Sequence, residues 1–543
     1  MGTADVFVRR ASGLRREWQS YDAFFYNFLQ INPAFNIYIP FLFTLIPGLF
    51  PGANIPLSWA MAVIILIPTM ITYAMMSASM PRSGGEYVFI SRLVHPSLGF
   101  SFVTLGFTLA NLVWITSVGQ LMAQQGIGIP LYLLGRMFDQ PGLAEAGAWA
   151  VTGTGSLTII VVLGIFLPAL LIAFGMRIYA YVQRVFMAVA VVAAVFLLIA
   201  FVTITQPAFA QSFNSFSANT MGAGAYSQII ESAKGAGYVY TDQFGFSDTI
   251  VSCVLAMSML MWAWFSTPLL GEIKSAQKVK STILFIAGPM VAVGLYQVAF
   301  SVLFPGMVGR EFLGAIGYLW NTGGIDVSQL PVPPYHAWLV GMAMPFWWVA
   351  ILLMFGETFH CIYANCSNLL GPVRYLFAQA FDRVLPARIA HVDPRTHSPL
   401  VAILIMVVGA VIWSVWQVAN PALWTYIMSA AFATLACVIG VCVAGAVFPY
   451  RMKEVYKASP IAKYQVGGVP LVTILGILGV LSQIFLGYYY VTVPELGMVG
   501  NPTSMIALTA IAIGLIIYYF IAKAYRKRQG ISMEFAFGEI PPE

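Results

Sequence analysis

The chain has 543 residues, of which 60% are hydrophobic and 8% are charged, and its formal net charge is +6. So few charges cannot cover a soluble domain, and runs of about 20 apolar residues, long enough to cross a bilayer, recur along the chain. The composition therefore excludes a soluble protein and predicts an all-α integral membrane protein. The basic excess lies in short segments between apolar runs, which is typical of membrane orientation and not of nucleic-acid binding.

Apolar windows bounded by Pro, Gly and charged residues predict twelve transmembrane helices. Their expected starts are Asp22, Pro56, Leu98, Gly155, Ile178, Asp248, Ser281, Gly341, Ser398, Leu423, Val469 and Ser504. If both termini are cytoplasmic, 23 of the 26 Lys and Arg residues fall in inner segments, and the exceptions are Arg136, Lys234 and Arg310. This asymmetry predicts a multi-pass protein of the cell (plasma) membrane with cytoplasmic termini.

The first predicted span, Asp22 to Phe50, carries a proline flanked by polar residues where hydrocarbon should surround it. Proline has no backbone N–H and clashes with the carbonyl four residues earlier, so the preceding turn is left with unpaired groups. Irregular backbone persists in a bilayer only where protein buries it or where it lines a watery cavity. A kink repaired by neighbouring helices is the structural alternative. The functional interpretation is a substrate site that includes Asn32, Pro33, Ala34, Phe35 and Asn36.

The sixth predicted span is also interrupted, by aromatic rings, two hydroxyls and Pro268. Five spans precede the long polar segment 206–247, so the next five run with opposite topology. Two broken helices in corresponding places predict two inverted five-helix repeats with the substrate held between them. For each ring, ordinary packing or lipid contact is the alternative. The expected substrate-binding residues of this span are Met261, Trp262, Trp264, Phe265 and Ser266.

The two long outer segments, 206–247 and 305–340, are rich in small polar residues and Pro, and we expect exposed loops or lids there. Two extra helices follow the second repeat. The expected organisation is a cytoplasmic tail (1–21), a first repeat (22–205), an extracellular loop (206–247), a second repeat (248–447), a cytoplasmic loop (448–468), helices 11 and 12 (469–524) and a cytoplasmic tail (525–543).

Three stretches on the predicted cytoplasmic side are similar to signatures of a known family. The first runs from Met80 to Arg92 and contains Gly84-Gly85-Glu86-Tyr87, and the others are residues 271–274 and 374–386. In this order they resemble the inner segments of the amino acid, polyamine and organocation permease superfamily. The resemblance implies the five-plus-five inverted-repeat fold and secondary active transport of amino acids or related small organic solutes by alternating access.

The inner-loop stretch also suggests how the cytoplasmic side closes. Two adjacent glycines permit a tight turn, and arginines can hold helix ends and carboxylates together. Topology anchoring alone is the alternative for the arginines. The residues expected in this inner gate are Arg82, Gly84, Gly85, Glu86, Arg92 and Arg374.

The chain departs from the family at the substrate site. Members that take amino acids usually carry Gly-x-Gly in the first broken helix, where bare amides hold the substrate carboxylate. Here that place holds Pro33-Ala34-Phe35, and Trp262 stands about where the sixth helix often has glycine. We therefore expect glycine-like amino acids to bind poorly, and apolar, aromatic or amine ligands to bind better. An amine, polyamine or organic-cation carrier or exchanger is the alternative function, because aromatic rings attract cations.

Glu357 is the acidic residue nearest the middle of a predicted span, about 18 Å along the eighth helix from Pro345. An intramembrane carboxylate is functional by default, because burying it unpaired is costly. His360 shares its face and Asn365 lies alongside. We expect Glu357, His360 and Asn365 to serve proton or sodium coupling, or to oppose a cationic substrate. A structural Glu–His pair is the alternative.

Two other classes of membrane protein fit the pattern less well. A channel needs a continuous polar stripe, whereas the polar residues here cluster at mid-depth. An intramembrane enzyme needs a nucleophile and a base, and no Gly-x-Ser-x-Gly or His-Glu-x-x-His motif accompanies His360. We expect no catalytic residue, metal ion, cofactor or nucleic acid. The expected partners are a small-molecule substrate, a coupling ion and the lipid bilayer.

Overall fold

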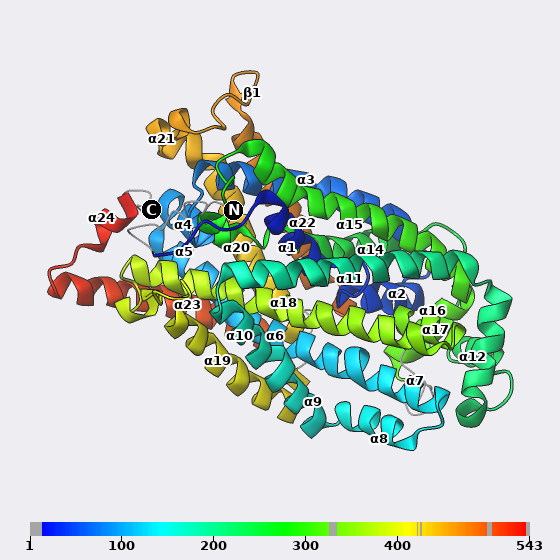
Figure 1. Ribbon diagram of the computed structural model, residues 1–543. Coiled ribbons are helices and arrows are strands. Elements are labelled where there is room, and N and C mark those ends of the chain that lie inside the picture. Colours follow the sequence, from blue (N-terminus) through cyan, green and yellow to red (C-terminus); the bar gives the residue numbers. More distant parts are fainter. Residues whose placement is uncertain (1–12, 325–333, 421, 424–425, 497–501, 539–543) are drawn as a thin grey trace, which may run out of the picture.

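The computed structural model describes residues 13–324, 334–420, 422–423, 426–496 and 502–538. Its helices run side by side in an elongated bundle, and the described parts of both termini lie at the same end (Figure 1). In this part of the chain, eleven helices are long and apolar enough to cross a membrane. The sheet described there is one hairpin, β1 (Gln465–Val466) paired with β2 (Val469–Pro470). The expected all-α membrane fold is confirmed.

The long helices start close to their expected positions. They are α3 (Ile55–Ser79), Pro96–Met137, Gly153–Ala173, α11 (Met176–Thr203), Phe246–Glu272, α15 (Val279–Val308), α18 (Trp347–Phe381), α19 (Leu400–Ala419), α20 (Tyr426–Arg451), α22 (Leu471–Thr492) and α23 (Pro502–Arg528). The eighth helix starts later than expected, because Pro345 separates α18 from the short α17 (His336–Ala343).

Two of these spans contain turns of π-helix. The segments of the third are α5 (Pro96–Val103), η1 (Thr104–Leu109), α6 (Ala110–Leu121), η2 (Met122–Gly128) and α7 (Ile129–Met137). The fourth comprises α9 (Gly153–Ile159), η3 (Ile160–Phe166) and α10 (Leu167–Ala173). Such wider turns shift the register of a helix and are frequent at functional sites.

Both expected interruptions are present. The first span consists of α1 (Ser20–Ile31) and α2 (Tyr38–Leu49), separated by a non-helical segment at residues 32–37. Each half has 12 residues and is too short to cross a bilayer alone, so the count of twelve spans and the inverted repeat stay predictions. The sixth span changes from α14 (Phe246–Leu260) to the 3₁₀ turns η4 (Met261–Trp264) and η5 (Thr267–Glu272).

The prediction of long outer loops is wrong in its secondary structure. Residues 206–247 contain α12 (Gln206–Met221) and α13 (Ala225–Gly235), and the second segment contains α16 (Arg310–Thr322). The three helices pack through aromatic rings: Tyr226 of α13 stacks on Phe312 of α16 at 4.2 Å between ring centroids, and Phe213 of α12 meets Phe312 edge-on at 5.1 Å. The many small polar residues of these segments led to the prediction of loops, because the buried aromatic contacts join residues far apart in the sequence. Residues 325–333 of the second segment, and Arg9 and Arg10 of the N-terminal tail, lie outside the described residues.

Glycines bring α16 unusually close to α2. A Cβ atom on Gly317 would lie 2.2 Å from the Thr44 carbonyl oxygen, and one on Gly48 would lie 2.5 Å from the Tyr318 nitrogen. No side chain fits at such distances, so the two backbones touch directly. The outer helix α16 is therefore packed firmly on the outer half of the first broken span.

Short helices complete the two ends of the bundle. They are α4 (Gly85–Leu93), α8 (Pro141–Ala150), η6 (Ala387–Ala390), α21 (Lys453–Ala458), η8 (Pro494–Leu496) and α24 (Met533–Gly538). We call the end that holds the described termini, α4 and the segments 272–280 and 382–399 the basic end, and we call the opposite end the outer end.

Gly317→Ala should lower the melting temperature of the purified protein, because an added methyl group clashes with the Thr44 carbonyl and overpacking of this kind costs about 1–3 kcal/mol. Gly142→Ala on α8 is the matched control, since a Cβ there meets no atom within 4 Å. Thermal unfolding in detergent measures both variants. Equal melting temperatures for the two variants would contradict the close packing of α2 and α16.

Candidate functional site

The interruption in the first span is held by side chains in place of helical hydrogen bonds. The Asn32 Oδ1 atom accepts from the backbone N–H groups of Ala34 at 2.9 Å and Phe35 at 3.1 Å. The Asn36 Oδ1 atom accepts from the Tyr38 N–H at 3.0 Å, which starts α2. These contacts satisfy donors that a continuous helix would have paired.

The carbonyls of the same interruption are satisfied from neighbouring helices. Gln297 Nε2 of α15 donates to the Pro33 carbonyl at 2.6 Å. His336 Nε2 of α17 donates to the Ala34 carbonyl at 2.6 Å, and since a carbonyl only accepts, this nitrogen carries the proton. All five residues from Asn32 to Asn36 are buried. The amides of Ala34 and Phe35 are therefore already occupied and cannot hold a ligand carboxylate unless Asn32 moves.

Asn27 of α1 connects the two broken spans. Its Oδ1 atom accepts from the Ser266 backbone N–H at 2.8 Å, and its Nδ2 atom donates to the Ser266 Oγ at 2.9 Å and to the Phe285 carbonyl at 2.5 Å. Sequence reasoning missed this residue, although an asparagine within an apolar half-helix was a signal. The side chain of Ser266 thus serves the contact between the spans.

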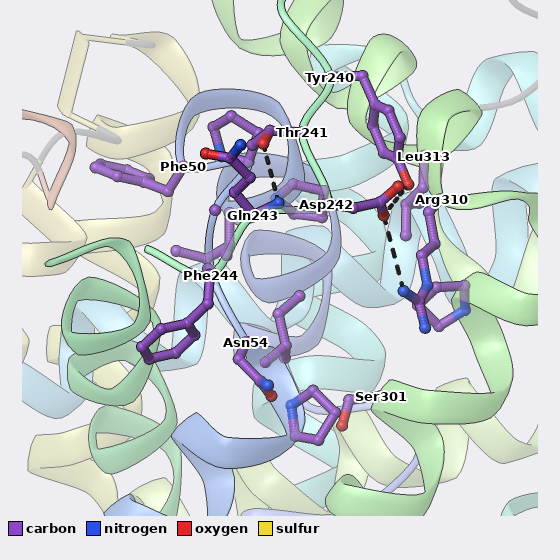
Figure 2. A pocket seen from close by; sticks show the side chains of 18 of the residues that line it. Phe50, Asn54, Tyr240, Thr241, Asp242, Gln243, Phe244, Ser301, Arg310 and Leu313 are labelled. Atoms are coloured by element: carbon purple, nitrogen blue, oxygen red, sulfur yellow. Dashed lines mark hydrogen bonds and ion pairs between the residues drawn. The ribbon is translucent and has the colours of Figure 1, made fainter. Parts of the chain in front are cut away.

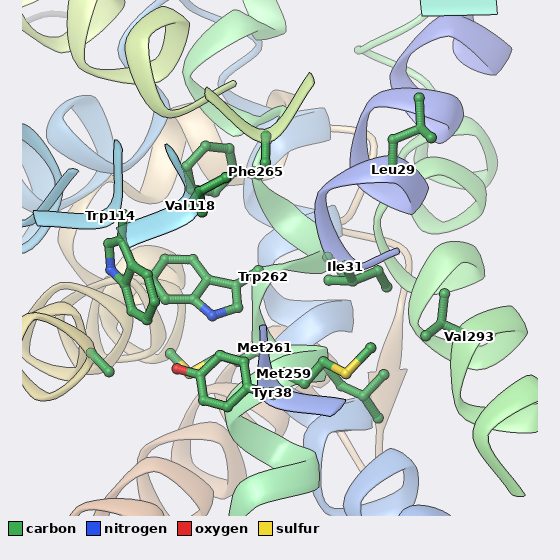
Figure 3. Packing of buried hydrophobic residues seen from close by; sticks show 14 of the residues in the cluster. Leu29, Ile31, Tyr38, Trp114, Val118, Met259, Met261, Trp262, Phe265 and Val293 are labelled. Carbon is green, nitrogen blue, oxygen red and sulfur yellow. The ribbon is translucent and has the colours of Figure 1, made fainter. Parts of the chain in front are cut away.

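A small cavity of about 40 Å³ lies beside the two interruptions. Three aromatic rings gather around it, those of Tyr38, Trp114 and Trp262 (Figure 3). Trp114 meets Trp262 edge-on at 5.7 Å between centroids, and Tyr38 lies 6.2 Å from Trp114. The complete lining is Gln30, Asn36, Ile37, Tyr38, Trp114, Val118, Trp262, His360, Ala364 and Asn368.

The polar groups of this cavity are carboxamides, one imidazole, the Tyr38 hydroxyl and the indole N–H groups of two tryptophans. The buried Gln30 Oε1 and His360 Nδ1 atoms have no hydrogen-bond partner within the described residues. Gln30 Nε2 donates to Asn368 Oδ1 at 3.4 Å. The Tyr38 hydroxyl and the Trp114 indole N–H also have no hydrogen-bond partner among the described residues. The cavity therefore offers a free acceptor in Gln30 Oε1, a free donor in Trp114 Nε1–H, and aromatic faces that attract cations.

The other aromatic residues of the sixth span serve packing. Trp264 is fully buried and stacks on Tyr73 at 5.0 Å between centroids. Phe265 stacks on Tyr26 at 6.4 Å. Met261 is buried as well. Of the expected residues in this span, Trp262 is the one that lines the small cavity.

A larger cavity of about 380 Å³ lies on the outer side of the small one. Both cavities share Ile37, and they follow successive turns of α6, with Val118 lining the small cavity and Leu121 the larger one. Trp320 of α16 and Tyr335, which precedes α17, also line the larger cavity. We call the small cavity the aromatic cavity and the larger one the outer vestibule. The aromatic cavity is therefore next to the outer vestibule, which leads toward the outer end.

A further outer cavity of about 250 Å³ lies between the α2–α3 turn and residues 238–244 (Figure 2). Asp242 and Arg310 face it and are 4.0 Å apart, and both are about 70% exposed. Solvent screens such a pair, so its attraction is weak. None of the sequence-predicted site residues lines this cavity.

Buried ion pairs close the basic end. Arg374 donates to both carboxylate oxygens of Glu272, at 2.7 and 3.0 Å. Arg92 donates to both oxygens of Asp382, at 2.5 and 2.7 Å. All four side chains are almost completely buried, so the loss of either partner would leave an uncompensated charge.

The inner-loop glycines fit against the second broken span. The Gly84 N–H donates to the Pro268 carbonyl at 2.9 Å, and its φ of +88° is one that side chains disfavour. A Cβ on Gly85 would lie 2.5 Å from the Thr267 carbonyl oxygen. Arg82 lies in the preceding turn, where its N–H donates to the Met80 carbonyl. The turn thus locks α4 onto η5.

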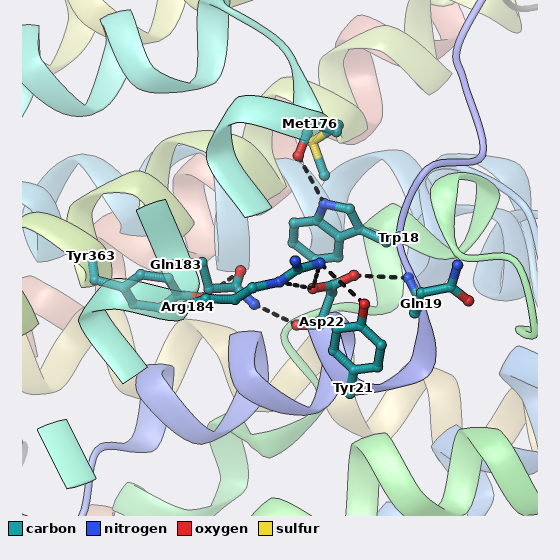
Figure 4. Close-up of polar contacts among 8 residues, drawn as sticks. All are labelled: Trp18, Gln19, Tyr21, Asp22, Met176, Gln183, Arg184 and Tyr363. Atoms are coloured by element: carbon teal, nitrogen blue, oxygen red, sulfur yellow. Dashed lines mark hydrogen bonds and ion pairs between the residues drawn. The ribbon is translucent and has the colours of Figure 1, made fainter. Parts of the chain in front are cut away.

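The N-terminal segment crosses the same end (Figure 4). The Trp18 N–H donates to the Glu272 carbonyl at 3.1 Å, the Lys274 N–H donates to the Trp18 carbonyl at 2.9 Å, and the Trp18 indole donates to the Met176 carbonyl at 3.1 Å. Asp22 accepts from Arg184 at 3.0 Å. Sequence reasoning missed the role of Trp18. These contacts seal the basic end below the aromatic cavity.

A family model described as amino acid permease matches residues 28–522. The chain belongs to this family. The match confirms the resemblance that the inner-loop stretches suggested, and it makes the chain a multi-pass membrane transporter of small molecules. No curated protein matches the sequence.

The structure separates the three residues expected to couple ions in this permease. Glu357 is 1% exposed, and the contact described for its carboxylate is the Cys361 Sγ at 3.6 Å. His360 lines the aromatic cavity, one turn further along α18. Asn365 donates to the Ile115 carbonyl at 3.0 Å. Thus His360 faces the cavity, Asn365 contacts α6, and Glu357 is buried without a charged partner in the described part of the chain.

Glu86 gives the permease a pH-sensitive contact at its basic end. Its Oε2 atom accepts from the Tyr375 hydroxyl at 2.6 Å, and burial raises the pKa of Glu86 to about 8 from its usual 4.5. Below pH 4.5 the folded and unfolded chains are both protonated at this group. Between pH 4.5 and 8 this carboxyl group is ionised in the unfolded chain but still neutral in the folded one. The free energy of unfolding therefore falls as the pH rises through this range.

The melting temperature of the permease should therefore fall between pH 5 and pH 8, and Glu86→Gln should reduce this fall, because glutamine stays neutral and can still accept from Tyr375. Glu145→Gln, at an exposed position of α8, is the control and should keep the wild-type dependence. Thermal unfolding at a series of pH values measures the effect. An identical pH dependence in Glu86→Gln and wild type would refute it.

Proposed function

We propose that this permease is a secondary active transporter that carries amino acids or related small organic solutes across the cell membrane by alternating access. A proton or sodium gradient drives it, and its basic end with both termini faces the cytoplasm. One observation carries the proposal: the aromatic cavity lies beside both broken spans, next to the outer vestibule and above a sealed basic end. That arrangement suits a carrier that receives its substrate from outside.

Alternating access then requires the basic end to open. The contacts that must separate are the Arg374–Glu272 pair and the backbone hydrogen bonds of Trp18. On the outer side, closure needs Tyr38 and Trp114 to approach the bound ligand from α2 and α6. In this mechanism Asn27 passes the movement of one broken span to the other, because it bonds to Ser266 directly.

A second candidate, an amine, polyamine or organic-cation carrier, is favoured by the contacts of Asn32. Its carboxamide occupies the amides of Ala34 and Phe35, which are the donors that a substrate carboxylate would need. The cavity instead presents aromatic faces, which attract cations, and the free acceptor Gln30 Oε1. These features support a ligand recognised by its amine or its ring more than by a carboxylate.

In a thermal-shift screen of the purified permease at two pH values, with and without sodium, aromatic and amine ligands should stabilise it more than glycine or alanine. Trp114→Ala should weaken binding of the best amine by about 10-fold, since a desolvated cation–π contact contributes up to about 2 kcal/mol. Trp149→Ala, on the exposed helix α8, should leave affinity unchanged. Tighter binding of glycine or alanine than of every larger ligand would count against this substrate class.

Glu357→Gln should abolish gradient-driven accumulation in proteoliposomes while leaving exchange of substrate across the membrane. Glutamine keeps the shape of the side chain but cannot bind or release a proton or balance a cation, and none of the described residues is a charged partner of Glu357 that could replace it. Glu145→Gln is the control. Wild-type accumulation with unchanged pH and sodium dependence in Glu357→Gln would show that the residue is structural.

A further inference from the structure

A fourth cavity, of about 200 Å³, lies at the basic end and is separate from the aromatic cavity. Four segments distant in the sequence enclose it: the N-terminal segment, the turn between α10 and α11, the end of η5 and the loop before α19. The charged side chains and the imidazole of its lining are Arg15, Glu17, Arg177, Glu272, Arg395 and His397. Neither the proposed transport pathway nor the family match accounts for it.

Three of these segments each bring one arginine to this cavity, Arg15, Arg177 and Arg395. Glu272 is already neutralised by Arg374, and Glu17 lies 3.9 Å from Arg15. Arg177 and Arg395 form no ion pair within 4 Å in the described part of the chain, although the nearby Asp393 acts electrostatically on Arg395. Two guanidinium groups of the lining therefore remain available for an anion.

His397 adds a nitrogen without a partner. Its Nδ1 atom donates to the Gly13 carbonyl at 2.9 Å, because a carbonyl can only accept. The Nε2 atom is buried and has no hydrogen-bond partner among the described residues. The backbone holds this ring in place at a φ of +54°, which few residues other than glycine adopt. A protonated His397 would present Nε2–H to an anion in the cavity.

The rim of the cavity is apolar and exposed. Phe174 is 51% exposed and Ile178 is 45% exposed, at the point where two membrane-spanning helices meet. Tyr181, one turn further along α11, is 57% exposed. A small inorganic anion needs no such surface, whereas acyl chains cover it. Charged lining with an apolar, membrane-level rim is the arrangement that suits a phospholipid.

We propose that this cavity binds the phosphate group of an anionic phospholipid, with Arg177 and Arg395 as its main ligands and Arg15 and His397 as supporting ones. The bound phosphate links the N-terminal segment to α11 and to the loop before α19. Arg15 lies three residues before Trp18, whose hydrogen bonds close the basic end. The lipid therefore stabilises the sealed conformation, and this effect does not depend on which solute the permease carries.

Thermal shifts of the full-length permease in a neutral detergent test the site. The probes are short-chain phosphatidylglycerol, phosphatidylcholine of the same chain length and inorganic phosphate. Phosphatidylglycerol should raise the melting temperature, and the double variant Arg177→Gln/Arg395→Gln should bind it roughly 30-fold more weakly, since each arginine near an anionic headgroup contributes roughly fivefold. The control is Arg451→Gln/Lys453→Gln, two exposed basic residues at the same end but outside the cavity.

Each result decides between the sources of the anion. An equal shift from phosphatidylcholine, or an unchanged affinity in the double variant, overturns the proposal. A shift of equal size from inorganic phosphate shows a site for free phosphate and overturns the assignment to lipid.

If the double variant is too unstable for thermal shifts, hydrogen exchange of the wild-type permease in nanodiscs tests whether the lipid stabilises the sealed end. The amides of Trp18 and Lys274 should exchange more slowly with phosphatidylglycerol than with phosphatidylcholine, and equal rates overturn the proposed link to the sealed end.

Discussion

The whole arrangement depends on one constraint: a backbone group at membrane depth must find a hydrogen-bond partner. Two spans of this permease give up part of their helical hydrogen bonds, and side chains from other helices replace them. Asn32 and Asn36 act within the first interruption, while Gln297 and His336 reach it from α15 and α17. The interruptions therefore fix which helices must surround them, and the aromatic cavity forms where they meet.

The two ends of the molecule are closed by different kinds of interaction. At the basic end, charged pairs such as Arg374–Glu272 and backbone hydrogen bonds of Trp18 hold the segments together. Such contacts are directional and are lost completely when the partners separate. Toward the outer end, aromatic rings and close glycine contacts predominate, as between α13, α16 and α2. Polar contacts thus hold one end of the carrier closed, and close apolar packing joins the helices of the other end.

Sequence reasoning predicted the features that follow from local chemistry. Pro33 and Pro268 marked both interruptions because proline removes a helical donor, and Gly84-Gly85 marked a tight turn that the structure uses. The sequence did not reveal which distant side chain repairs which carbonyl, so Asn27, Gln297 and His336 were missed. Small polar residues also disguised α12, α13 and α16, because their buried faces depend on contacts between segments far apart in the chain.

The glycine contact between α2 and α16 has a consequence for movement. Because the two backbones touch at Gly317 and Gly48, neither helix can rotate or slide without lifting the other away. The half-helix α2 and the outer helix α16 then move as one rigid unit about the non-helical residues beside Pro33. A small displacement at these residues becomes larger with distance along α2. A ligand that shifts Asn36 slightly would therefore move α16 by a greater distance.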